Sequence, residues 1–190
     1  HSAGARMFAE AAGCEVQALD PAHQYGSEGL TGGEVLELSG IEIHVVATPG
    51  HSSDSLSFHL PQDGSLLTGD TVLGRGTTVV AYPDGTLVEY LDSLHRLREL
   101  VHESDLSRIL PGHGPTLDQP GAVIDYYLAH RQERLEQVRA VVTELGSHGL
   151  PIQDLAQRVV ETVYADVPKS VWPLALLSVR AQLEYLATHG

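Results

Sequence analysis

Three apolar segments of this chain end at a glycine that is followed by a candidate metal ligand. The three junctions are, in chain order, Gly50-His51, Gly69-Asp70 and Gly112-His113. A strand that ends in glycine can turn sharply, so the next residue stands clear of the sheet edge. Two imidazoles and one carboxylate suit zinc, with iron or manganese as alternatives. The sequence therefore predicts strands that deliver His51, Asp70 and His113 to one metal-binding cleft.

Each of these signals is weak when it is taken alone. A Gly-Asp pair after an apolar strand is commonly a turn. The chain has 11 histidines in 190 residues, and we treat most of them, including His23 and His59, as ordinary surface or helix residues. The ordered combination of three glycine-flanked ligands is more specific than any one of its parts.

The order His51, Asp70, His113 resembles the downstream ligands of the metallo-β-lactamase-fold hydrolases. Members of this superfamily carry a first motif, His-x-His-x-Asp-His, and then a single His, an Asp and a last His. The opening residues 1–4, His-Ser-Ala-Gly, are similar to the end of that first motif. The resemblance implies that His1 is a further ligand and that His-x-His-x-Asp and the first strands precede the given sequence. An expression-tag origin of His1 is the alternative.

The pattern of apolar residues predicts an α/β (α+β) chain, a partial αββα sandwich followed by a helical tail. Alternation predicts strands at 15–19, 34–38, 42–48, 55–60, 65–68 and 107–110, and a period near 3.6 predicts helices at 2–12, 86–103, 122–145, 151–165 and 171–187. We assign residues 1–144 to a metallo-β-lactamase-like domain and 145–190 to a winged-helix-like domain. A helical cap used only for packing is the alternative for the tail.

The region after Asp70, including Tyr126-Tyr127 and the helical tail, resembles one branch of the superfamily. This branch is the β-lactamase-like protein group with a C-terminal winged helix, whose characterised animal members are similar to endoribonucleases acting on single-stranded RNA. A thioesterase of the hydroxyacylglutathione hydrolase type shares the metal ligands and is the alternative. A non-catalytic binding module is a third class, if the natural chain starts at His1.

The resemblance implies an enzyme that hydrolyses its substrate with a zinc-activated hydroxide. Asp70 would bridge two zinc ions, with manganese or iron as alternatives, while His51 binds the first ion and His1 and His113 bind the second. Asp70 and His113 are the catalytic candidates. Because the carboxylate of the first motif is not in the given sequence, we expect this chain by itself to be inactive or impaired.

Further residues are assigned roles around this site. We expect Ser52, Asp54 and Ser55 to orient His51. The candidates for substrate contact are Arg75, Thr77, Thr78, His130 and Arg131.

Charge restricts the partners of the chain. The formal net charge is −14, and residues 1–118 carry 17 acidic and only 5 basic side chains. Such a surface is a poor platform for phosphate backbones, so RNA would need Arg131, Arg134 and Arg139 of the less acidic tail. A solvated helix face is the alternative for these arginines. We expect a small ester or thioester or single-stranded RNA as substrate, and a homodimer as the assembly.

The remaining composition indicates a cytoplasmic location. The sequence has no apolar run of transmembrane length and no visible signal peptide, so we expect no membrane partner. Its single cysteine, Cys14, excludes an intrachain disulfide.

Overall fold

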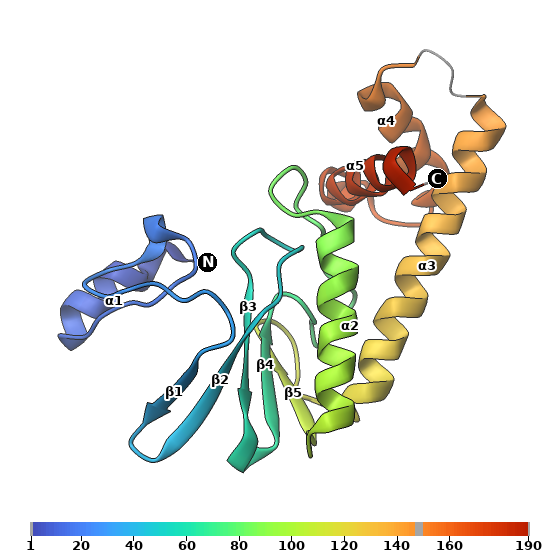
Figure 1. Cartoon of the computed structure of the whole chain (residues 1–190). Coiled ribbons are helices and arrows are strands. Elements are labelled where there is room, and N and C mark those ends of the chain that lie inside the picture. The colour runs from blue at the N-terminus through green and yellow to red at the C-terminus, as the bar shows by residue number, and fades with distance from the viewer. Residues whose placement is uncertain (1, 147–149, 190) are drawn as a thin grey trace.

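A computed structural model describes residues 2–146 and 150–189 of the chain, and its centre is one six-stranded sheet (Figure 1). The strands follow each other across the sheet in sequence order. They are β1 (Val35–Leu38), β2 (Ile41–Ala47), β3 (Leu56–Leu60), β4 (Ser65–Gly69), β5 (Arg108–Pro111) and β6 (Leu117–Asp118). The five strands expected between residues 34 and 110 are confirmed, and the two-residue β6 was not predicted.

The pairing of β4 with β5 is parallel, whereas all other neighbours in the sheet are antiparallel. A parallel pair needs a crossover connection, and α2 (Leu87–Glu103) provides it. Thr86 caps this helix by accepting a hydrogen bond from the Glu89 amide. The crossover places the carboxyl ends of β4 and β5 at the same edge of the sheet.

The two faces of the sheet differ in burial. Leu66 and Ile109 are neighbours on β4 and β5, and both are fully buried against α2. Leu67 and Leu110 are the next pair along the same strands, and they point to the other face, where they are only partly buried. The helices α2 and α3 therefore cover one face of the sheet.

The N-terminal segment lies at the β1 side of the molecule (Figure 1). It contains the expected helix, as the 3-10 turn η1 (Ser2–Gly4) and α1 (Ala5–Ala12). The strand expected at 15–19 is wrong, because the pairing there is a single bridge between Val16 and Tyr25. Cys14 is exposed and free.

The described residues also form three further 3-10 turns. They are η2 (Pro21–His23), η3 (Pro61–Asp63) and η4 (Lys169–Val171).

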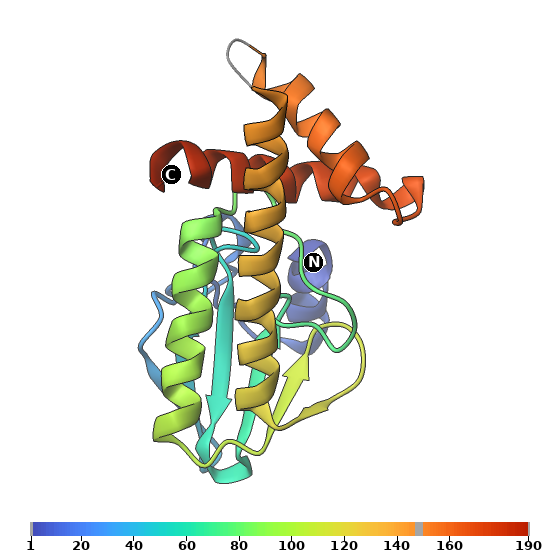
Figure 2. The same ribbon diagram turned by 90° about the vertical axis from the view of Figure 1, so that its right-hand side faces the viewer.

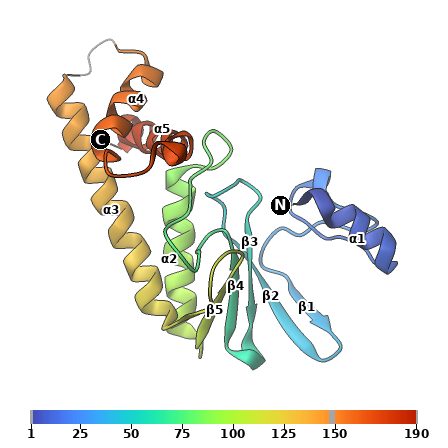
Figure 3. The ribbon, with the colours of Figure 1, turned by 180° about the vertical axis from the view of Figure 1, so that it is seen from behind.

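The C-terminal region is helical, as the sequence predicts. It comprises α3 (Pro120–Leu145), α4 (Ile152–Val163) and α5 (Trp172–His189), and α5 lies across α3 (Figures 2 and 3). The division at residue 144 stays a prediction, because α3 runs through it without interruption as far as Leu145. In the described parts of the chain, we find no helix with the length and apolar character needed to cross a bilayer.

Candidate metal centre

His51 lies just beyond β2, in the tight turn that follows Pro49. Gly50 has a φ of 130°, and a Cβ there would lie 2.3 Å from the Cα of Tyr90, so only glycine fits this turn. The His51 ring donates from Nδ1 to the Val79 carbonyl at 2.7 Å, since a carbonyl can only accept. The Nε2 lone pair is thereby left to face Asp70.

Asp70 follows β4, and His113 follows β5. The parallel pairing of these strands brings the two residues together, and the Gly112 amide donates to the Gly69 carbonyl at 2.8 Å. A Cβ on Gly112 would lie 2.9 Å from Asp70 Oδ1, so this glycine leaves room for the carboxylate. Asp70 is only 11% exposed. Gly112, which was predicted only to let the chain turn at the strand end, thus also leaves space for the Asp70 carboxylate.

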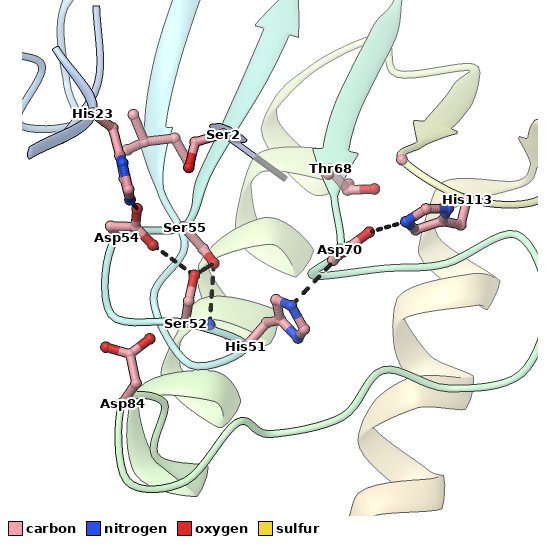
Figure 4. Close-up of a pocket in the computed structure, with 13 residues that line it drawn as sticks. Ser2, His23, His51, Ser52, Asp54, Ser55, Thr68, Asp70, Asp84 and His113 are labelled. Carbon is pink, nitrogen blue, oxygen red and sulfur yellow. Dashed lines mark hydrogen bonds and ion pairs between the residues drawn. The ribbon is translucent and has the colours of Figure 1, made fainter. Parts of the chain in front are cut away.

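The three side chains converge as the sequence predicts. Asp70 lies between the two histidines, with His51 Nε2 3.7 Å from Oδ2 and His113 Nε2 3.6 Å from Oδ1 (Figure 4). Neighbouring ligand atoms on a tetrahedral ion, with bonds of 2.0–2.2 Å, lie roughly 3.4 Å apart. The two distances are close to this separation, and each histidine faces a different oxygen of Asp70. This set of two imidazoles and one carboxylate therefore fits a divalent metal ion. His1 lies outside the described residues.

These ligands line a cavity of about 640 Å³. Its ionisable lining side chains are histidines and carboxylates, and no lysine or arginine is among the described residues that line it. These ionisable residues are His23, His51, Asp54, Asp70, Asp84 and His113.

Ser52, Asp54 and Ser55 line the same cavity but bind each other. The Ser52 hydroxyl donates to Asp54 Oδ1 at 2.7 Å and lies 2.8 Å from the Ser55 hydroxyl (Figure 4). The group that holds the His51 ring is instead the Val79 carbonyl, with the Thr78 hydroxyl 3.3 Å from the same nitrogen. Sequence reasoning missed the Val79 carbonyl, because a backbone group has no residue-type signature.

A second group of ligand-type side chains lies at the edge of this cavity. Asp20, His23 and Asp54 offer three ligand atoms within 4.8 Å of one another, and His23 Nε2 is 3.9 Å from Asp54 Oδ2. Asp20 also caps the turn η2 by accepting from the Ala22 amide. His23 is exposed, as expected of a surface residue, and its side chain also lines the cavity, which sequence reasoning did not foresee. His59 is buried in the sheet and does not line it.

The expected substrate residues are scattered. Thr78 is buried beside His51, Thr77 is partly buried, and exposed Arg75 lines a different cavity of about 380 Å³ with Tyr126 and Tyr127. None of these three side chains lines the cavity that contains the metal ligands.

The helix α3 carries the last two candidates. Burial, strengthened by the positive charge of Arg131, lowers the pKa of the His130 ring. Arg131 is only 4% exposed, and its guanidinium donates to the Thr78 carbonyl. The expectation that Arg131 contacts RNA phosphates is therefore wrong. Its spacing could have revealed this, since Ile124, Arg131, Leu135 and Val138 lie on one buried stripe.

Comparisons with known proteins identify both parts of the chain. Residues 1–117 match the model of the metallo-beta-lactamase superfamily, and residues 156–190 match that of the beta-lactamase associated winged helix domain. The beta-lactamase-like protein 2 homolog of Drosophila melanogaster is 34% identical over 80% of this chain and 47% of its own length. The atrochrysone carboxyl ACP thioesterase of Aspergillus fumigatus is 29% identical over 80% of this chain and 46% of its own.

The solved structures agree with this result. A beta-lactamase domain protein from Burkholderia ambifaria superposes with a TM-score of 0.70 at 27% identity, over 86% of this chain and 46% of that protein. The chain spans about half the length of the curated relatives it matches. With its three converging candidate ligands and its two family matches, the chain belongs to the metallo-beta-lactamase superfamily, in the branch that carries a winged helix domain.

Proposed function

We propose that the protein is a metal-dependent hydrolase that cleaves a small ester or thioester. The observation that carries the proposal is the placement of His51 Nε2 and His113 Nε2 against the two oxygens of Asp70. Members of this superfamily typically bind metal ions, and zinc is the metal we propose for a site of imidazole and carboxylate ligands. When bound, a pair of such ions lowers the pKa of a water and polarises the carbonyl to be cleaved.

The side chains of this protein would prepare the site for that chemistry. The Val79 carbonyl holds the proton of His51 on Nδ1, which keeps Nε2 available as a ligand. Asp70 is largely buried, so its carboxylate is shielded from competing water. We propose His113, with His1, for the second ion.

The charge of the cavity favours a neutral acyl substrate over RNA. No lysine or arginine lies among its described lining residues, whereas Asp54, Asp70 and Asp84 do. A polyanion would have to be bound against these carboxylates with few cations nearby. The arginine route for RNA is interrupted at buried Arg131, while Arg134 contacts the Tyr164 ring and the Val163 carbonyl. The Aspergillus relative is named as a thioesterase, which agrees with this choice.

The test compares two substrate classes on the purified protein loaded with zinc, manganese or iron. Release of thiol from short acyl thioesters is measured beside cleavage of a labelled single-stranded RNA. We expect Asp70→Asn to lower kcat/KM for the thioester by about 100-fold or more, a loss of at least about 2.7 kcal/mol. The matched control is Asp92→Asn, because Asp92 is an exposed carboxylate on α2. Cleavage of RNA but not of any ester or thioester would overturn the substrate proposal.

A further inference from the structure

The segment from residue 78 to residue 81 contacts His51 at three points, one of which is the Thr78 hydroxyl, 3.3 Å from ring Nδ1. The Val79 carbonyl accepts from the ring at 2.7 Å, and the Ala81 amide donates to the His51 carbonyl at 3.1 Å. The segment therefore fixes both the ring and the backbone of this ligand. Its own position decides where the Nε2 lone pair points.

The helix α3 holds this loop through two buried side chains one turn apart. The Arg131 guanidinium donates to the Thr78 carbonyl. The Tyr127 hydroxyl accepts from the Leu73 amide at 2.8 Å and lies 3.1 Å from the carbonyls of Leu73 and Gly76. Residues at i and i+4 share one helix face, so both side chains of α3 reach the same loop. Their contacts extend along the loop from Leu73 to Thr78.

Stability alone gives a poor account of Arg131. Its guanidinium is buried over the face of Tyr90, 4.8 Å from the ring centre, and no carboxylate pairs with it among the described residues. Its Nε has no hydrogen-bond partner in the same part of the chain. Burial of a cation without a counter-charge carries a desolvation cost, which the contact with the Tyr90 ring offsets only in part. What the guanidinium adds is a fixed direction for the Thr78 carbonyl.

We propose that Arg131 is a positioning residue for the metal ligand His51. By holding the Thr78 carbonyl, it fixes the peptide plane between Thr78 and Val79. The Val79 carbonyl, one residue further on, is then held where the His51 ring can donate to it, so that Nε2 faces Asp70. This inference rests on the proposed function, because that function requires His51 in this orientation.

A link to the C-terminal helices follows from the same segment. The Val80 amide donates to the Ser178 hydroxyl of α5 at 3.4 Å. The three consecutive residues 78–80 are therefore bound by α3, by His51 and by α5. The helical region thus contacts the segment that holds His51, although none of the side chains described for this region lines the cavity.

The test measures metal binding and the state of the His51 ring separately from catalysis. In Arg131→Met, we expect zinc affinity, measured by competition with a chromophoric chelator, to fall by roughly 10–100-fold. The nitrogen chemical shifts of the His51 ring in the metal-free protein should move toward a mixture of tautomers. The unfolding midpoint should stay equal or rise, because the buried charge is gone. Arg131→Lys, which restores a donor, should recover part of the affinity.

The control is Arg134→Met, which alters the same type of side chain on the same helix. Arg134 contacts Val163 at the end of α4 and the ring of Tyr164 that follows it, and it does not contact the 78–81 segment, so zinc affinity and the His51 shifts should match the wild type. Unchanged affinity and unchanged shifts in Arg131→Met, or equal losses in both variants, would overturn the proposal.

Two further outcomes remain decisive. If Arg131→Met does not fold, Arg131→Gln replaces it, because glutamine stays polar but is too short to hold the guanidinium position. If Arg131→Gln then had the zinc affinity and the His51 ring shifts of the wild type, the positioning role would be refuted. If the zinc and ring measurements respond as expected while no ester or thioester is cleaved, the proposed function fails and the role of Arg131 stands.

Discussion

Gly112 offers a direct test of the metal centre, because it leaves the space that the Asp70 carboxylate occupies. A Cβ at position 112 would lie 2.9 Å from Asp70 Oδ1 and 3.1 Å from the backbone of Gly69, whereas ordinary contact begins at 3.4 Å. In Gly112→Ala, the carboxylate oxygen must therefore retreat by about 0.5 Å, which exceeds the tolerance of about 0.2 Å for a metal–ligand distance. Its φ lies outside the left-handed region, so the substitution adds steric contact without forcing a disallowed backbone.

We expect Gly112→Ala to bind zinc at least about tenfold more weakly, which is about 1.4 kcal/mol. The free energy of unfolding in the absence of metal should change by only about 1 kcal/mol, as for most single substitutions. Chelator competition measures the first quantity, and urea unfolding monitored by circular dichroism measures the second.

The matched control is Gly121→Ala in the first turn of α3. A Cβ there would meet Val101 Cγ1 at 3.6 Å, an ordinary contact. Zinc affinity should be unchanged, and stability should rise by up to about 1 kcal/mol, since alanine has the higher helix propensity. Wild-type zinc affinity in a folded Gly112→Ala protein would refute the steric reasoning.

Three other predictions concern stability and association. Hydrogen bonds from Thr31 lower the pKa of Glu34 to about 2. The stabilising contribution of this carboxylate is therefore complete above its ordinary pKa of 4.5 and is lost as the pH falls toward 2. The difference in urea midpoint between wild type and Glu34→Gln should shrink over that pH range. Ile109→Ala, at a fully buried position, should lower the free energy of unfolding by about 2–5 kcal/mol. Ile152→Ala, at a 45% exposed position, should lower it by about 1 kcal/mol or less. Equal losses in the two variants would contradict the assignment of Ile109 to the core. Phe8→Ser, which removes a 70% exposed aromatic side chain, should raise the monomer fraction of this 190-residue chain in sedimentation velocity, and an unaltered distribution would exclude that surface from association.

The glycine-flanked strand ends were sufficient to predict that the three candidate ligands converge. His51, Asp70 and His113 follow β2, β4 and β5, and strand alternation located all three strands. These signals are local, because turn chemistry and side-chain alternation are properties of short segments. The mixed α/β fold with its helical tail was predicted for the same reason.

Errors arose where tertiary contacts override local preference. The apolar segment at 15–19 has β character, but its pairing is limited to one bridge, and strand formation depends on an available partner. Arg131 was placed on a solvent-exposed face because of its charge, although its spacing from Ile124 and Leu135 assigns it to the buried stripe. The contact between Val79 and His51 spans 28 residues, and no pattern of residue types encodes it.

The continuous helix α3 limits how this protein can be divided or recombined. One core contains Ile124 and Leu135 of α3 together with Ala181 of α5, and the other contains Val138 of α3 together with Val179 of α5. Both cores therefore use the same two helices. Exchange of the C-terminal region at residue 145 would remove Ala181 from the core beside the sheet. A chimaera must therefore inherit α3, α4 and α5 as one unit, with its junction before Pro120, and the sheet side must still supply partners such as Leu66 and Ile109 for the first core.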